Sequence, residues 1–171
     1  MLSVKNLLFL AVAVSGTVIQ RAPPATPEDI QILNKDLQAI TSATSLYNGR
    51  SLQPITKAVD TYVADVKKTV KDIDSKGPFS EPVTAKLISY IKSDFLPNAK
   101  KGFEATRNKK PSFKTSRVIP QVVANLKSSY KATKALVDAL LAHAPANKKA
   151  QIKDLLKEYE AAYEKTIKIF S

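Results

Sequence analysis

Apolar residues recur at steps of three and four along most of this chain, and no other feature constrains the fold as much. In the first segment beyond the N-terminal region the apolar stripe consists of Ile30, Leu33, Leu37, Ile40, Thr44 and Tyr47. This period places the residues on one face of an α-helix, whereas a half-buried strand alternates every second residue. Alternating runs are nearly absent, so the sequence predicts an all-α protein.

Capping and breaking residues divide the pattern into five or six amphipathic helices. Thr26 suits the N-cap of the first helix, Pro27 suits its first turn, and Asn48-Gly49 suits its end. Four further helices are predicted from about 51 to 75, 80 to 95, 116 to 142 and 147 to 169. Short connections between such helices predict a single-domain antiparallel bundle.

Two places inside this pattern need separate interpretation. Pro97 predicts either a kink or the first turn of a short additional helix, because a proline inside a helix removes a hydrogen bond. The polar stretch 108–112 predicts a loop, after which Ser116 is expected to cap the longest helix.

The N-terminal residues 1–21 predict a secretory signal peptide. A short basic region precedes eight unbroken apolar residues, Leu7 to Val14, and cleavage is expected after Gly16. A second cut after Arg21 would make the remainder a pro-segment and leave 22–171 as the helical domain. The apolar run is too short to span a bilayer, which takes about 20 residues, so no transmembrane segment is predicted.

The chain is strongly basic, with 27 Lys and Arg against 15 Asp and Glu and a formal net charge of +12. Most of these cations are lysines, whereas base and phosphate recognition relies heavily on the arginine fork. Together with the signal peptide, this argues against nucleic acid as a partner.

The densest group of cations, here called the basic cluster, has only Glu104 as a nearby acid. It contains Lys100, Lys101, Arg107, Lys109, Lys110, Lys114 and Arg117. One interpretation is a lysine-coated, well-solvated surface. The other is adhesion to an anionic cell-wall polymer, to lipid headgroups or to an acidic partner, which salt would weaken.

The sequence offers little material for catalysis. Cysteine is absent, so disulfides are excluded, and His143 is the single histidine. His143 falls where the longest helix should end, a position typical of a residue that interacts with the helix dipole. No nucleophile elbow or glycine-rich phosphate loop occurs. We therefore expect a protein without enzymatic activity, metal or cofactor.

Two segments resemble the fungal hydrophobic surface binding protein A family, which includes the cell wall galactomannoproteins. One is DFLPNAKKGFEATRNKKPSF, Asp94 to Phe113, followed by a long apolar helix; the other is the opening helix EDIQILNKDLQAITSATSLYNG with its Tyr-x-Gly turn. The resemblance implies a secreted protein, adsorbing to hydrophobic surfaces or holding a fatty acid between its helices. Surface adsorption, with recruitment of secreted hydrolases, is the first expectation, and a fatty-acid carrier is the alternative.

The chain differs from the wall-anchored members of that family. It lacks their long Ser/Thr-rich tail and ends at Ile169-Phe170-Ser171 without a hydrophobic anchor signal. This favours a freely secreted, extracellular protein over one attached to the cell wall.

If a ligand chamber exists, the second, longest and final helices are its expected walls. The residues predicted to line it are Val63, Val66, Phe95, Phe103, Leu126, Tyr130, Val137 and Tyr159. The two phenylalanines are expected to close one end, and the alternative is an ordinary packed core. Hydroxyls at Thr44, Thr133 and Thr166 interrupt the stripes and suit a carboxylate head, although helical threonines usually bond to their own preceding turn.

Overall fold

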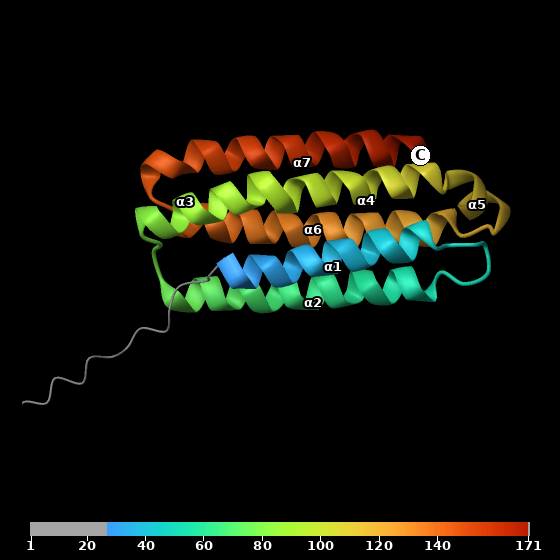
Figure 1. Ribbon diagram of the computed structural model, residues 1–171, viewed down its shortest axis with the longest axis horizontal. Helices are drawn as coiled ribbons and strands as arrows, with labels where there is room; N and C mark the ends of the chain where they lie inside the picture. The colour runs from blue at the N-terminus through green and yellow to red at the C-terminus, as the bar shows by residue number, and fades with distance from the viewer. Residues whose placement is uncertain (1–26, 171) are drawn as a thin grey trace, which may run out of the picture.

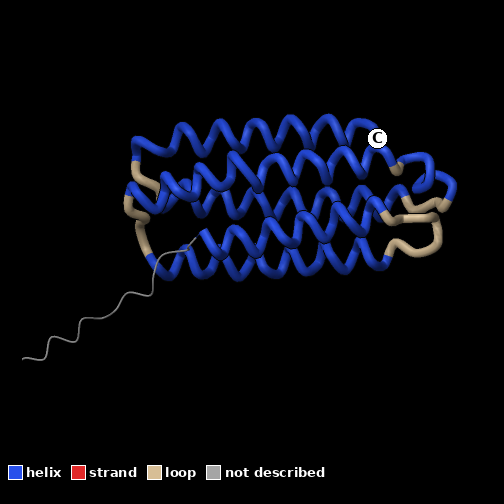
Figure 2. The backbone as a smooth tube through the Cα atoms, viewed as in Figure 1, coloured by secondary structure: helices blue, strands red, loops and turns tan. Residues whose placement is uncertain are grey.

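The computed structural model describes residues 27–170, and the predicted signal segment and the Thr26 cap lie outside them. The elements are α1 (Pro27–Ser45), α2 (Gln53–Lys76), α3 (Glu81–Tyr90), the π-helical turn η1 (Ile91–Phe95), α4 (Leu96–Asn108), α5 (Lys110–Thr115), α6 (Ile119–His143), the 3₁₀ turn η2 (Ala146–Lys148) and α7 (Lys149–Phe170). The described part of the chain contains no strand, and its loops gather at the two ends of the molecule (Figure 2). The predicted all-α bundle is confirmed.

The long helices run along one common axis (Figure 1), and the pairs that pack together close into a ring. Helix α2 packs against α1 and α6, α4 packs against α1 and α7, and α6 packs against α7. The order around this helix ring is therefore α1, α2, α6, α7, α4 and back to α1. The apolar stripes point inward, so the core fills the space that the five helices enclose. None of the helices in the described range is long and apolar enough to cross a membrane.

Pro97 produces a local widening of the helix instead of a break. The Leu96 N–H donates to the Ile91 carbonyl, five residues earlier, so the turn before the proline is a π-turn. A proline in a regular α-helix clashes with the carbonyl four residues before it, and the wider turn relieves that clash. Helices α3 and α4 consequently continue through η1, and Pro97 lies in the first turn of α4, as one of the two predicted alternatives requires.

The predictions for the connection before α6 were wrong in two respects. The stretch 108–112, expected to be a loop, is helical except at Lys109, because α4 ends at Asn108 and α5, which buries Phe113 in the core, begins at Lys110. Ser116 does not cap α6, which begins at Ile119. Arg117 adopts a left-handed backbone (φ 58°), and the Ser116 hydroxyl donates to the Gly49 carbonyl at 2.9 Å. Ser116 thus ties this connection to the α1–α2 loop.

Gly102 permits the close approach of α4 to α1. A Cβ atom at this position would lie 2.9 Å from the Thr41 hydroxyl, which itself donates to the Leu37 carbonyl. We expect Gly102→Ala to lower the free energy of unfolding by about 1 kcal/mol, because the strain of overpacking exceeds the better helix propensity of alanine. Urea unfolding of G102A, T41A and the double variant measures this. The interpretation predicts that G102A becomes neutral or stabilising once Thr41 is Ala, and a cost that persists unchanged would contradict it.

Candidate functional site

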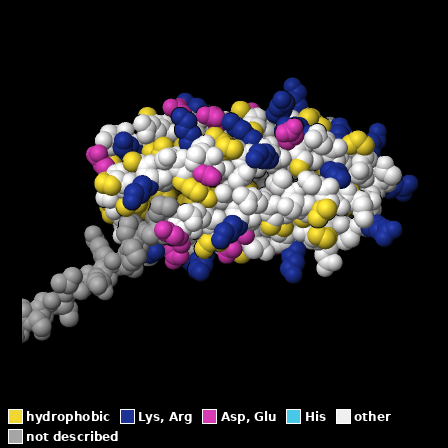
Figure 3. Space-filling view, in the orientation of Figure 1, with side chains coloured by type: hydrophobic (Ala, Val, Ile, Leu, Met, Phe, Trp, Pro, Cys, Tyr) yellow, Lys and Arg dark blue, Asp and Glu magenta, His cyan; other side chains and the backbone are white. Residues whose placement is uncertain are grey.

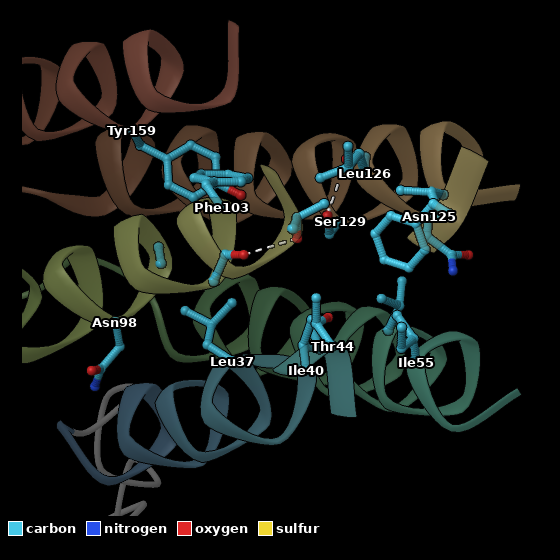
Figure 4. A pocket seen from close by; sticks show the side chains of 16 residues that line it. Leu37, Ile40, Thr44, Ile55, Asn98, Phe103, Asn125, Leu126, Ser129 and Tyr159 are labelled. Carbon is cyan, nitrogen blue, oxygen red and sulfur yellow. Dashed lines mark hydrogen bonds between the residues drawn. The ribbon is translucent and has the colours of Figure 1, made fainter. Parts of the chain in front are cut away.

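A cavity of about 50 Å³ lies inside the helix ring. All five ring helices and α5 contribute to its wall, which is almost entirely apolar (Figure 4). The residues that line it are Leu37, Ile40, Thr44, Ile55, Val59, Asn98, Ala99, Gly102, Phe103, Thr106, Phe113, Val122, Asn125, Leu126, Ser129 and Tyr159. We call it the central cavity, and its position at the meeting point of every ring helix makes it the candidate ligand site.

A second, smaller cavity of about 30 Å³ lies further along the bundle interior. Residues of η1, α4, α6 and α7 line it, among them Phe95, Val137 and Leu155. Tyr159 borders both cavities, so its side chain stands between them. The packed interior therefore contains two small apolar spaces, and Tyr159, an aromatic ring with a hydroxyl group, borders both.

Three buried hydroxyl groups meet at this dividing point, and we call them the hydroxyl cluster. Tyr62 of α2 is fully buried, and its Oη lies 2.6 Å from Thr133 Oγ1 on α6. Thr133 Oγ1 also lies 3.1 Å from Tyr159 Oη and 3.0 Å from the Ser129 carbonyl. Thr133 thus bonds to its own preceding turn, as helical threonines usually do, and also to two tyrosines from other helices.

The two phenols of the hydroxyl cluster remain protonated at physiological pH. Burial, as the largest cause, raises the pKa of both Tyr62 and Tyr159, since a buried phenolate would lose its hydration. Thr133 has one hydroxyl hydrogen for two acceptors, the Ser129 carbonyl and Tyr159 Oη. When Thr133 donates to Tyr159, the Tyr159 hydrogen becomes free to donate to a third group. The cluster can therefore offer a hydrogen-bond donor to an acceptor in either cavity.

The eight residues predicted to line a chamber do not face one common space. Phe103, Leu126 and Tyr159 line the central cavity. Phe95 and Val137 line the smaller cavity with Tyr159, so Phe95 and Phe103 do not close the same end. Val63 and Val66 line a groove at the seam between α2 and α6 instead, where Val63 is partly buried and Val66 is a buried core residue.

Tyr130, the eighth of these residues, lies at the seam between α6 and α7. Its ring stacks on Tyr163, with centroids 4.2 Å apart, and its hydroxyl donates to Glu160 at 3.0 Å. Burial is the first cause that raises its pKa, and the hydrogen bond to Glu160 adds to the effect. It lines neither of the two interior cavities.

Sequence reasoning named Thr44, Thr133 and Tyr159, but it missed the other residues of α1 and the place of Tyr62 in the hydroxyl cluster. Leu37, Ile40 and Thr44 of α1 form one side of the central cavity, although the first helix was not among the expected walls. Tyr62 was not among the residues predicted to line the site. A buried tyrosine needs a partner for its hydroxyl, and that requirement was the available signal.

The basic cluster is partly used inside the protein. Lys109 Nζ donates to the Tyr47 carbonyl at 2.9 Å, beyond the end of α1, and Lys110 Nζ donates to the Ile169 carbonyl in the last turn of α7. Arg107 donates to Thr166 Oγ1 at 2.8 Å, and Lys100 pairs with Glu158 at 2.7 Å. Cations at helix C-termini satisfy carbonyls that lack helical partners. Four of the seven cations thus have identified structural partners.

The three remaining cations of the cluster, Lys101, Lys114 and Arg117, are exposed. On the face shown in Figure 3, Lys and Arg side chains are spread widely, and several project at the end of the bundle that carries α5. Adhesion of this end to an anionic polymer stays a prediction.

His143 lies at the end of α6, as expected. Its Nε2 is 3.2 Å from Asp74 Oδ1 of α2. Within residues 27–170 no group of three or more His, Cys, Asp or Glu side chains is arranged to hold a metal ion.

The model of the hydrophobic surface binding protein A family matches residues 24–142 of the chain. The chain belongs to this family. The match ends in the last turn of α6. Helix α7 of this family member, which contains Tyr159, therefore lies beyond the residues that the family model matches. A search of curated proteins finds no match to the sequence.

Solved structures similar to this family member share its fold. AFMP4P in complex with palmitic acid is 21% identical with a TM-score of 0.80, over 84% of this chain and 96% of that one. Ligand binding domain 1 of the Penicillium marneffei MP1 protein, complexed with arachidonic acids, is 19% identical with a TM-score of 0.71, over 84% and 99%. Domain 2 of the same protein, complexed with multiple arachidonic acids, is 15% identical with a TM-score of 0.75, over 85% and 96%.

Proposed function

We propose that this protein binds a fatty acid inside the helix ring, with the acyl chain in the central cavity. The observation that carries the proposal is an apolar cavity to which every ring helix contributes. The proposal is also supported by structures of similarly folded proteins in complex with palmitic acid and with arachidonic acids. Fatty-acid binding thus takes precedence over surface adsorption, which the sequence alone had placed first.

The central cavity has to widen to hold a long acyl chain. Its volume of about 50 Å³ is far below the ~300–1,000 Å³ of typical ligand pockets. A palmitoyl chain has about fourteen methylene groups, and their burial at ~0.8 kcal/mol each contributes on the order of 11 kcal/mol. That gain is large compared with the cost of separating a few helix contacts. The chain contains no cysteine, so no disulfide opposes the outward movement of a ring helix.

The hydroxyl cluster is the proposed partner of the carboxylate head. Tyr159 borders both interior cavities, so a head group at its hydroxyl leaves the central cavity to the acyl chain. The raised pKa values keep the phenols as donors, and a carboxylate buried here needs such donors to offset its lost hydration.

Cavity filling tests the acyl-chain site. Ala99 lines the central cavity, whereas Ala139 of α6 is also buried but lines neither interior cavity. We expect Ala99→Leu to leave the free energy of unfolding within about 1 kcal/mol of the parent and to weaken palmitate binding at least tenfold. Its matched control, Ala139→Leu, should lose about 1–3 kcal/mol of stability, because overpacking a solid core is costly. Denaturant midpoints and titration calorimetry with palmitate measure both.

Removing the head-group donor gives a second, independent readout of the proposed function. Tyr159→Phe should weaken palmitate binding more than binding of the matching fatty alcohol, because only the carboxylate requires a strong donor. If Ala99→Leu binds palmitate as well as the parent does, the central cavity is not the site.

Adsorption to hydrophobic surfaces is the second candidate function, and the description of the family favours it. The closed bundle has few large exposed apolar side chains among its described residues, the most exposed being Leu46 at 80%. On the face shown in Figure 3 the apolar side chains form small separate groups. We therefore infer that adsorption requires the ring to open, so that helix stripes face the surface. Recruitment of secreted hydrolases to that surface stays a prediction.

We further infer that the protein is secreted by means of the predicted signal peptide, residues 1–21, and acts outside the cell without enzymatic activity. Mass spectrometry of the protein from culture medium tests this, since the mature N-terminus should follow Gly16 or Arg21.

A further inference from the structure

A groove of about 800 Å³ lies at the surface between α2 and α6, and no residue that lines it also lines the central cavity. It differs from the interior cavities in that exposed lysines contribute to its lining. Its lining consists of Val63, Ala64, Val66, Lys67, Lys68, Val70, Lys71, Ser128, Lys131, Ala132 and Ala135. These are four lysines above a floor of valines and small side chains, and we call this feature the lysine groove.

The groove exists because small residues of α6 face medium-sized residues of α2. Ser128, Ala132 and Ala135 recur at steps of four and three, which places them on one face of α6. Opposite them, Val63 and Val70 of α2 are one heptad apart and only partly buried. A valine of α2 that faces an alanine of α6 fills less of the space between the two helices than a pair of larger side chains would. A hollow therefore remains at the surface. Val63, Val70, Ala64 and Ala135 therefore leave apolar surface in contact with water, whereas Val66 and Ala132 are buried.

The charged side chains that line the groove are all positive. Lys67 and Lys71 are four residues apart on α2, so they share a helix face and repel each other. Lys131 lines the groove from α6. The acids of these two helices are Asp60, Asp65, Asp72, Asp74 and Asp138, and none of them lines the groove. The groove thus combines uncovered apolar surface with uncompensated positive charge.

We propose that the lysine groove is a second binding site, which takes a single-chain anionic amphiphile such as a fatty acid. The acyl chain covers the valine and alanine floor. The acidic head lies among the ammonium groups, whose long stems extend along apolar surface while their charges reach solvent. An anion there relieves the repulsion between Lys67 and Lys71, which a neutral or cationic amphiphile cannot do.

This site goes beyond the proposed function and does not depend on it. The central cavity offers neutral hydroxyl donors inside the helix ring, whereas the groove offers lysine charges on exposed side chains. Salt should therefore weaken binding in the groove much more than binding in the central cavity.

The test uses laurate as the probe and NMR of the ¹⁵N-labelled protein as the readout. In the Ala99→Leu background, with the central cavity filled, laurate should still shift amides of residues 63–71 and 128–135. The charge reversal K67E/K71E/K131E should weaken this binding at least tenfold. Ala135→Trp, which fills the groove from an exposed position, should weaken it by a similar factor. Dodecyltrimethylammonium, a cation with the same chain length, should leave these amides unshifted.

The matched control reverses three exposed lysines of α7, K153E/K165E/K168E, and changes the net charge equally. It should bind laurate in the groove within about twofold of the parent. The proposal is overturned if both triple variants lose binding equally, since net charge alone then explains the effect. It is also overturned if the cation binds as laurate does. Binding to anionic phosphatidylglycerol vesicles through these lysines, without shifts from free laurate, would assign the groove to a bilayer surface instead.

Discussion

Replacing Phe113 by alanine is expected to lower the free energy of unfolding by about 3–5 kcal/mol, the range for truncating a buried phenylalanine. The side chain is 1% exposed and is the buried residue of α5. Its ring lies 4.8 Å from that of Tyr47 and 6.3 Å from that of Phe170, measured between centroids. Truncation therefore detaches α5 from the ends of both α1 and α7.

Chemical denaturation of F113A measures this loss, and Phe113→Leu is the control because it keeps most of the apolar volume and should cost less than about 1.5 kcal/mol. Since Phe113 also lines the central cavity, truncation enlarges that space. Saturating palmitate should consequently raise the Tm of F113A by more than it raises the Tm of the parent. A loss below 1 kcal/mol in F113A would show that α5 does not anchor this end of the bundle.

Replacing Asp36 by asparagine is expected to stabilise the protein at pH 7.5 by about 1–2 kcal/mol. Asp36 of α1 lies against Asp65 of α2, and its buried Oδ2 has no hydrogen-bond partner. Burial, together with the charge and hydrogen bond of Asp65, raises the pKa of Asp36 from 3.8 to about 6. Two carboxylates can share a hydrogen bond only when one of them is protonated, so above this pKa the pair repels.

The sign of the pH dependence follows from the direction of this shift. Between pH 3.8 and about 6 the folded state binds a proton that the unfolded state has released, so this contribution to stability falls as pH rises through that window. A shift of about two units corresponds to roughly 3 kcal/mol, which we reduce to about 1–2 because Asp36 is partly exposed.

Urea titrations of the parent and D36N at pH 4 and pH 7.5 measure the effect. D36N should be more stable than the parent only at the higher pH. The control Asp60→Asn, at an exposed acid of α2, should have the same free energy of unfolding as the parent at both pH values. A parent that equals or exceeds D36N in stability at pH 7.5 would contradict the interpretation. Comparing variants at each pH removes the general effect of the high net charge.

The long helices and their inward faces followed from the sequence alone, whereas α5 did not. The spacing of Ile30, Leu33 and Leu37, for example, already marked the side of α1 that is buried. This information is local, because a period of 3.6 residues belongs to each helix separately. Family membership could likewise be inferred from the spacing and from the Leu-Pro step at Pro97. The structure confirmed the predicted class of fold and corrected the boundaries around α5.

The site was decided by tertiary structure. A periodic stripe shows which face of a helix is buried but not which other stripe it meets, so Val66 and Leu126 appeared to share a chamber that they do not share. The bond between Tyr62 and Thr133 joins residues 71 positions apart, and their pairing depends on α2 packing against α6. The same holds for Lys109, whose role was fixed when ring closure brought a helix end within its reach. Local periodicity determined the elements, whereas the order of helices around the ring determined which polar groups meet.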